Sequence, residues 1–254
     1  MNVVVCVKQI PDPAVPGELE ADHTLKREGK LILDESDSYG VEMALQLVDK
    51  AGGGEVTLIS MAPNGEVSGL RTALAMGAAR AILVSDDALS GADALTTSKV
   101  LAKCVERAGD VDLVLTATES TDGYTGTVPA QIAELLGWPS LTFAKHIELG
   151  DGKATVQRQT EAGYDVVSAS LPAVVSVTAG VVEPRYPSFK GIMAAKSKPV
   201  DQVTTADLGL SGLAPNQKIT SVGAAPEREA GEKIEDDGTA FERIVQFLDE
   251  LKVI

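Results

Sequence analysis

The feature that most constrains the fold of this chain is a regular alternation between short apolar runs and amphipathic segments. Residues 2–8 read NVVVCVK, a continuous β-branched run that is typical of a strand buried on both faces. Similar runs at residues 55–60, 81–85 and 111–116 are separated by segments with helical spacing of their apolar residues. Strands that alternate with helices form parallel βαβ units, and right-handed crossovers place helices on both faces of the sheet. We therefore predict a doubly wound, mostly parallel α/β sheet of the Rossmann-like type.

The alternation stops after Trp138. Residues 145–149, 154–159 and 165–171 form three runs with polar turns between them, which is the pattern of antiparallel strands. One more buried strand is predicted at residues 173–178. The sequence therefore predicts an antiparallel β extension on the parallel sheet.

The C-terminal part has a different character. From residue 200 the chain is polar and weakly patterned until residues 241–251, which have the apolar spacing of an amphipathic helix. A long segment with little structure of its own is uncommon inside a compact domain. We therefore predict an α/β nucleotide-binding domain at residues 1–199 and an arm at residues 200–254 that needs a partner surface. A disordered linker to a small terminal helix is the alternative.

The charge of the chain limits its partners. The formal net charge is −15, so we expect neither nucleic acid nor an anionic membrane surface to bind. No apolar run is long enough for a membrane span, and the chain starts directly with a strand, so we expect no targeting segment and a cytoplasmic location. Cys6 and Cys104 lie far apart in apolar stretches and are predicted to be buried thiols in a reducing compartment.

Three loops are candidates for a nucleotide site. Residues 7–10, 60–65 and 116–128 follow predicted strands, and open α/β sheets bind ligands at the carboxyl ends of their strands. The third loop reads TATESTDGYTGTV and leads into a predicted helix that begins near Thr127. The free N–H groups and the positive dipole end of that helix would point into the loop.

The side chains of this third loop suit a phosphate. Gly123 and Gly126 allow the backbone to approach a ligand closely, and Thr125 supplies a hydroxyl. Glu119 and Asp122 could hold a ribose or adenine edge, although both would repel a nearby phosphate. We interpret the loop as a phosphate cradle; an ordinary glycine-containing connection is the alternative.

No catalytic or metal-binding constellation is visible in the sequence. His23 and His146 lie far apart, with no nucleophile or carboxylate arranged beside them. The cysteines lack the spacing of a zinc or iron–sulfur site. The chain also lacks the glycine fingerprints of dinucleotide dehydrogenases and P-loop enzymes. We therefore expect no metal and no independent catalytic activity.

Three stretches carry a resemblance to a known family. They read VCVKQIPDP at residues 5–13, RTALAMGAARAILV at residues 71–84, and VQRQTEAGYDVVSASLPAVVSVT at residues 156–178, followed by EPRYPSFKGIMAAK at residues 183–196. They resemble the beta subunits of electron-transfer flavoproteins, and the match runs over nearly the whole chain. One departure is Gln159, where the family usually has a glutamate that could meet an arginine of the alpha subunit.

The resemblance implies a function. Such a beta subunit forms a heterodimer with an alpha subunit that makes most of the contacts to a redox-active FAD, and it holds AMP itself. The heterodimer accepts electrons from acyl-CoA and related dehydrogenases and passes them to the respiratory chain through a membrane quinone oxidoreductase. Two alternatives remain open. One is an electron-bifurcating subunit with a second FAD and NADH as donor, and the other is a stand-alone nucleotide-binding protein of the stress-protein type.

The resemblance also implies site residues. In the family segment that aligns with residues 34–37, only Asp37 agrees, and the aromatic wall near the flavin is missing at Ser36. Tyr124 could fill the space that a second flavin needs, which favours AMP. The residues expected to bind the cofactor are Cys6, Asp37, Met61, Glu119, Asp122, Gly123, Thr125, Gly126, Thr127 and Val128.

A partner-docking loop is expected at residues 184–196, where the family carries a recognition loop with one protruding apolar side chain. Phe189 occupies the matching position, and its polar neighbours are an unusual setting for a core residue. The residues expected to dock on dehydrogenases are Arg185, Tyr186, Phe189, Ile192 and Met193. A basic cluster for electrostatic steering is expected from Arg185, Lys190, Lys196 and Lys198.

Overall fold

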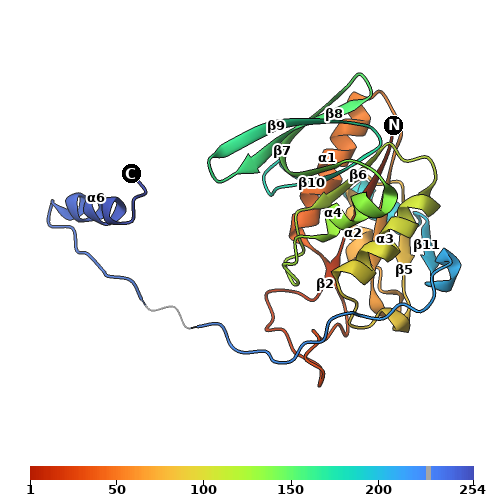
Figure 1. Cartoon of the computed structure of the whole chain (residues 1–254), viewed down its shortest axis with the longest axis horizontal. Helices are drawn as coiled ribbons and strands as arrows, with labels where there is room; N and C mark the ends of the chain where they lie inside the picture. The colour runs from red at the N-terminus through yellow and green to blue at the C-terminus, as the bar shows by residue number, and fades with distance from the viewer. Residues whose placement is uncertain (227–229) are drawn as a thin grey trace. The chain divides into compact units, whose positions relative to one another are not determined.

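The computed structural model describes residues 1–226 and 230–254, which divide into two compact units, Met1–Thr220 and Ser221–Ile254 (Figure 1). The first unit contains the β-sheet and the helices α1 to α5. The second unit contains one helix, α6 (Ala240–Glu250), none of whose residues is buried. In the described part of the chain, no helix combines the length and the apolar character that crossing a bilayer requires.

One sheet organises the first unit. Among the described residues its strand order is β11-β5-β4-β1-β6-β10-β7-β8-β9. The strands from β11 to β7 run parallel, and β8 and β9 continue the sheet in antiparallel fashion. The strands are β1 (Asn2–Cys6), β4 (Glu55–Met61), β5 (Arg80–Val84), β6 (Leu113–Ala117), β7 (Ser140–Gly150), β8 (Lys153–Thr160), β9 (Gly163–Ser170), β10 (Ala173–Val177) and β11 (Val200–Val203). This arrangement confirms the predicted doubly wound α/β fold with an antiparallel extension.

Helices connect the parallel strands. They are α1 (Glu35–Lys50), α2 (Ser68–Met76), α3 (Ala94–Ala108), α4 (Val128–Leu136) and α5 (Phe189–Ala195). A separate two-stranded ribbon pairs β2 (Gln9–Ile10) with β3 (Ile32–Leu33), and short 3-10 turns lie at Pro63–Gly65, Asp87–Leu89 and Ala206–Leu208. Glycines end several helices; Gly137, for example, closes α4 in a left-handed conformation that costs a glycine little.

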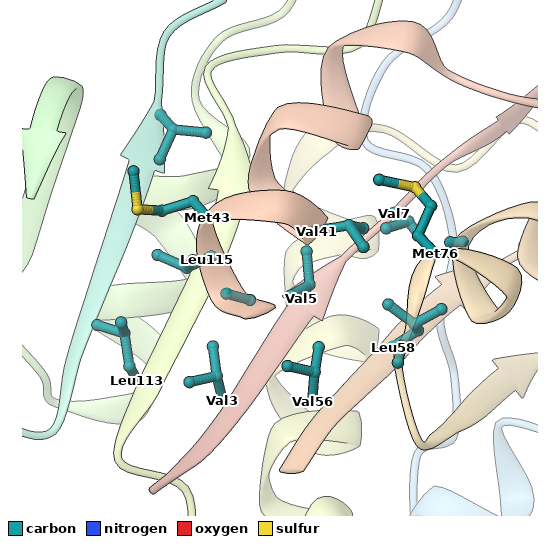
Figure 2. Packing of buried hydrophobic residues seen from close by; sticks show 14 of the residues in the cluster. Val3, Val5, Val7, Val41, Met43, Val56, Leu58, Met76, Leu113 and Leu115 are labelled. Carbon is teal, nitrogen blue, oxygen red and sulfur yellow. The ribbon is translucent and has the colours of Figure 1, made fainter. Parts of the chain in front are cut away.

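The core consists of two apolar layers, one on each face of the sheet. In β1, Val3 and Val5 belong to the layer that also contains residues of α1 and α2, whereas Val4 and Cys6 belong to the layer that contains residues of α3. Figure 2 shows the first layer, in which side chains of β1, β4 and β6 meet Val41 of α1. Burial on both faces explains why the sequence of β1 is apolar without alternation.

The helix α1 has several polar residues near its start. It begins at Glu35, and Asp34 is its cap, whose side chain accepts a hydrogen bond from Ser36 N. The Asp37 carboxylate is instead used by another segment, since it accepts a hydrogen bond from the Lys8 backbone. A contact distant in sequence therefore decides which of several polar residues caps the helix.

The boundary between body and arm also differs from the prediction. Residues 200–203 lie in the predicted arm, yet they form β11, which pairs in parallel with β5. Because β11 is an edge strand, Asp201 and Gln202 stay exposed and only Val203 is buried, so no apolar run marks it in the sequence. The first unit accordingly extends to Thr220 instead of ending at residue 199.

Candidate functional site

The candidate nucleotide site lies where the strand order reverses. From β1 the chain proceeds to β4 and β5 on one side, whereas β6 pairs with the other side of β1 and is followed outward by β10. At such a switch point the loops after the two central strands leave in opposite directions, which makes their carboxyl ends the usual ligand position in α/β sheets. The loops after β1 and β6 are therefore the ones that matter here.

A carboxylate with two cationic partners joins these loops. Lys8 follows β1, and its Nζ lies 2.6 Å from Oδ1 of Asp122 in the loop after β6. Arg27 forms an ion pair with the other oxygen of the same carboxylate and also donates to the carbonyl of Gln9 at 3.3 Å. Burial alone would raise the pKa of Asp122, but the two cations outweigh it and hold that pKa below its ordinary value. Asp122 is thus an ionised, fully paired group that fixes the loop.

Two further carboxylates hold the same region. Oδ2 of Asp34 accepts hydrogen bonds from Thr121 N at 2.8 Å and from Thr121 Oγ1 at 3.1 Å, so the start of α1 holds the loop after β6. Asp37 is buried and accepts a hydrogen bond from Lys8 N at 2.5 Å. Burial, reinforced by the nearby carboxylate of Asp34, raises the pKa of Asp37 well above its ordinary value despite that hydrogen bond.

The second half of the loop after β6 presents open backbone. Within the described residues, no hydrogen bond from the N–H groups of Gly123, Thr125, Gly126 or Thr127 is recorded. All four residues are exposed, and Gly126 has a left-handed φ of 66°. A Cβ at Gly126 would lie 3.5 Å from Oε2 of Glu119, which shows that this carboxylate sits beside the glycine. The loop therefore offers a row of N–H donors with one carboxylate at its side.

The loop after β4 is joined to the site through Gln9. This buried side chain donates to Glu66 O at 2.8 Å and accepts from Leu70 N at 3.2 Å, so it connects the loop after β1 to the start of α2. Met61, at the end of β4, is partly buried against the core layer that contains Cys6. The three candidate loops thus belong to one connected region at the carboxyl edge of the sheet.

The structure places the expected cofactor-binding residues along this edge in two environments. Cys6, Asp37 and Met61 are buried or half-buried at the base of the region. Glu119, Asp122 and the residues up to Val128 lie in the loop above α4, of which Asp122 is occupied by its cationic partners. Thr127 precedes the first residue of α4 and makes no side-chain capping bond to the backbone, although its hydroxyl accepts a hydrogen bond from Gln131 Nε2 of α4 at 3.4 Å.

Sequence reasoning missed three residues of this region: Lys8, Arg27 and Asp34. Lys8 and Arg27 lie far from Asp122 in sequence, and no local pattern connects them to it. Asp34 opens the DESD segment, in which the resemblance points only to Asp37. Lys8 and Arg27 are positive charges in a chain whose formal net charge is −15, and this was the one property that could have indicated an anion site near them.

The second candidate site is an exposed apolar surface on the segment before and within α5. Tyr186 is 93% exposed and Phe189 is 80% exposed, and Ile192 and Met193 on the same short helix are also exposed. Arg185, the fifth residue expected to dock, pairs with a buried glutamate, Glu42, on α1 while its own side chain stays 41% exposed. Exposed aromatic side chains in a group are characteristic of interaction surfaces.

The described residues contain no cluster of three or more histidine, cysteine or acidic side chains placed to hold a metal ion. His23 is half-buried in a loop, and His146 lies on β7, where its Nε2 is 3.1 Å from Oε1 of Glu148. What the geometry offers is binding and docking.

Comparisons with known proteins identify the family of this chain. The family model described as "Electron transfer flavoprotein domain" matches residues 22–208. "Electron transfer flavoprotein subunit beta" of Mycobacterium leprae is 42% identical, and its namesake in Mycobacterium tuberculosis is 41% identical; each alignment covers 100% of this chain and 99% of the relative. "Caffeyl-CoA reductase-Etf complex subunit CarD" of Acetobacterium woodii is 38% identical, with 92% of both chains covered. This chain therefore belongs to the electron transfer flavoprotein family, among its beta subunits.

Proposed function

We propose that this chain, with its alpha subunit, forms a heterodimeric electron carrier in which it holds AMP and has no catalytic activity of its own. The redox-active FAD is held mainly by the alpha subunit and accepts electrons from acyl-CoA and related dehydrogenases. A membrane quinone oxidoreductase takes the electrons onward. Family membership implies flavin and an alpha subunit. The observation that supports AMP best is the loop after β6.

The phosphate end of AMP fits the donor set of this loop. The N–H groups of Gly123, Thr125, Gly126 and Thr127 are exposed and point to no recorded acceptor in the described residues. The positive end of α4 lies directly after them. Asp122 does not oppose a phosphate, because Lys8 and Arg27 more than balance its charge. The chain can therefore bind the phosphate with backbone groups, and the nearby cations favour an anion.

The nucleoside end fits the acidic side of the same region. Glu119 is exposed and lies beside Gly126, where it can accept hydrogen bonds from ribose hydroxyls. Asp37, biased toward its neutral form by burial, can donate as well as accept. These carboxylates therefore offer hydrogen-bond partners for the nucleoside beside the donors proposed for the phosphate.

A second FAD is the other candidate ligand, favoured by the similarity to the Acetobacterium woodii protein. In that case NADH would be the donor of an electron-bifurcating complex. Tyr124 favours AMP: it has a left-handed φ of 48°, is 68% exposed and follows Gly123 directly, in the space that the larger ligand would need. Extracting and quantifying the nucleotides of the purified heterodimer distinguishes the two ligands. One FAD with one AMP per heterodimer supports AMP, and two FAD support the second flavin.

Replacing Gly126 with Val tests the AMP site. The substitution puts a β-branched side chain at a left-handed position where the backbone must approach the ligand, and losing a hydrogen bond to a charged group costs about 1.5–3 kcal/mol. We expect AMP content to fall while FAD content stays. Gly152→Val is the matched control, because Gly152 has a similar φ of 70° in the remote β7–β8 turn. Full AMP occupancy in the Gly126 variant would refute the site.

The exposed surface around α5 supports the dehydrogenase part of the proposal. We name Tyr186, Phe189, Ile192 and Met193 the docking surface. An aromatic side chain as exposed as Phe189 gains most by entering a pocket on a partner. Lys190 in α5 and Lys196, which follows α5, are exposed, which suits an acidic partner surface.

The second unit supports the heterodimer part. The α6 residues Phe241, Ile244, Val245 and Phe247 are exposed, and so is Leu251, which follows the helix. An isolated helix of this length is marginal in water, so its apolar side chains need a surface to cover them. We propose that the alpha subunit supplies that surface, and that the C-terminal arm leads to it.

A further inference from the structure

The segment that carries the docking surface is fixed to the body at its start. Arg185 donates through Nε to Oε2 of Glu42 at 2.6 Å and through Nη2 to Oε1 at 3.0 Å. Glu42 lies on α1 and is 3% exposed, and Gln46 donates to its Oε1 at 2.8 Å. A two-point bond between a guanidinium and a buried carboxylate fixes orientation as well as position. The backbone just before Tyr186 is therefore fixed relative to α1.

The same segment is fixed at its end. Arg71 of α2 donates through Nη1 to the carbonyls of Ala195 at 2.6 Å and Lys198 at 2.7 Å. Lys198 in turn donates through Nζ to Leu74 O at 2.9 Å and Ala78 O at 2.6 Å, at the C-terminal end of α2. These bonds reach the carbonyl of Ala195, the last residue of α5, and that of Leu74 in the last turn of α2, as well as carbonyls just beyond the two helices. The two cations thus hold α5 and the chain after it against α2.

The middle of the segment depends on a glycine. A Cβ at Gly191 would lie 2.4 Å from the carbonyl oxygen of Ala75, closer than real contacts allow. Ala195, one turn later, is buried. Ser188 caps α5 by accepting a hydrogen bond from Gly191 N at 3.0 Å. The inner face of α5 therefore lies directly on α2. The docking surface, on the other side of α5, faces solvent.

From these contacts we infer that Glu42, Arg71, Gly191 and Lys198 are positioning residues, which hold the docking surface in its partner-binding form before any partner arrives. The inference rests on the proposed docking of dehydrogenases on this surface. A surface ordered in advance loses less conformational freedom on association, so the same apolar contacts give tighter binding. None of the four needs to touch the partner.

The positioning contacts also define the charge that a partner meets. Arg185 and Lys198, two of the four cations expected to steer a partner, are occupied within the chain by Glu42 and by the carbonyls of α2. Lys190 in α5 and Lys196, which follows α5, remain exposed. The partner surface that fits is therefore an apolar socket for Phe189 with an acidic rim opposite two lysines.

The test uses the intact heterodimer as electron acceptor for an acyl-CoA dehydrogenase of the same organism. We expect Lys198→Met and Gly191→Ala each to raise the apparent KM for the heterodimer about tenfold, with kcat at saturation and flavin content unchanged, because a surface that must first be ordered binds more weakly. Amide hydrogen exchange in residues 189–198 should accelerate in both variants. Lys153→Met is the matched control, because Lys153 is exposed at the start of β8, outside the docking surface, and its KM should stay within about twofold of the wild type.

A double-mutant cycle decides whether these residues act through Phe189. In a Phe189→Ala background, Lys198→Met should add little further rise in KM, since the positioned side chain is already gone. If the effects of the two substitutions on KM were fully additive, the positioning inference would fail while the docking proposal stood. The same holds if Lys198→Met left KM unchanged and Phe189→Ala raised it. An unchanged KM in Phe189→Ala would instead overturn the docking proposal. If Gly191→Ala loses flavin through misfolding, Lys198→Met, which removes donors without adding bulk, decides the outcome.

Discussion

Two short helices of this protein, α5 and α6, both present aromatic side chains to solvent, but they do so for different reasons. Phe189 of α5 is exposed while the helix beneath it is held by Arg71, Lys198 and the close contact of Gly191. Phe247 of α6 is exposed on a helix that buries no residue at all. The comparison shows that exposure alone does not define an interface. A preformed surface suits a partner that binds and leaves, whereas an unsupported helix suits a partner that stays.

Removing the second unit should have the largest effect. A chain that ends at Thr220 keeps the whole sheet, including β11, but loses α6. Fully burying one large apolar side chain contributes about 1.5–3 kcal/mol, so losing several should weaken the heterodimer at least about 100-fold. Sedimentation or titration of the two purified subunits measures this. Unchanged heterodimer affinity would mean that α6 has no role in subunit association.

The substitution Phe189→Ala should have the next largest effect and should act on a different partner. Loss of an aromatic anchor costs about 2 kcal/mol, which corresponds to about a 30-fold rise in apparent KM with the dehydrogenase. Heterodimer affinity and flavin content should not change. Phe247→Ala should show the reverse pattern, with weaker subunit association and an unaltered KM once the heterodimer is formed. If both substitutions affected the same property, the distinction between the helices would fail.

The smallest expected effect is on the stability of the fold at acid pH. Burial would raise the pKa of Glu42, but hydrogen bonds from Arg185 and Gln46 hold it below its ordinary value of 4.5. The folded state therefore binds this proton less readily than the unfolded chain, so the contribution to stability is full above pH 4.5 and is lost as pH falls through the lower folded value.

Urea unfolding of the heterodimer at several pH values checks this. The free energy of unfolding should fall less steeply below pH 4.5 in Glu42→Gln than in the wild type. The effect is confined to acid, because at neutral pH Glu42 is already ionised. Parallel curves for the two proteins would show that the Glu42–Arg185 pair makes no pH-dependent contribution.

The elements that the sequence predicts well are those whose signal is local. β1 is apolar at every buried position, and β7 to β9 alternate about polar turns, so their existence and type follow from short windows. β11 was missed because an edge strand with exposed Asp201 and Gln202 has no such signal. The predicted family needed longer motifs, and the comparisons confirm it.

The site was predictable in position but not in its internal bonds. The glycines and the helix start after β6 indicate a ligand loop, because they act on their immediate neighbours. The pairing of Lys8 and Arg27 with Asp122 joins residues that are separated by 114 and 95 positions, and nothing in the sequence selects that carboxylate over Glu119. The same holds for Arg185 and Glu42, which only the packing of α1 brings together. Such contacts form only when the fold brings distant residues together, so short stretches of sequence do not predict them.

The burial of Cys6 and Cys104 in the sheet's second apolar layer has a chemical consequence. Burial is the main reason that the pKa of the Cys6 thiol lies far above its ordinary range and that of Cys104 is raised to about 12. The thiolate is the form that alkylating reagents and peroxides attack, so both sulfurs remain unreactive spectators at neutral pH. A protein that works beside a reducible flavin thus carries no thiol in the described residues that competes for oxidants, and its native fold should resist iodoacetamide until it is unfolded.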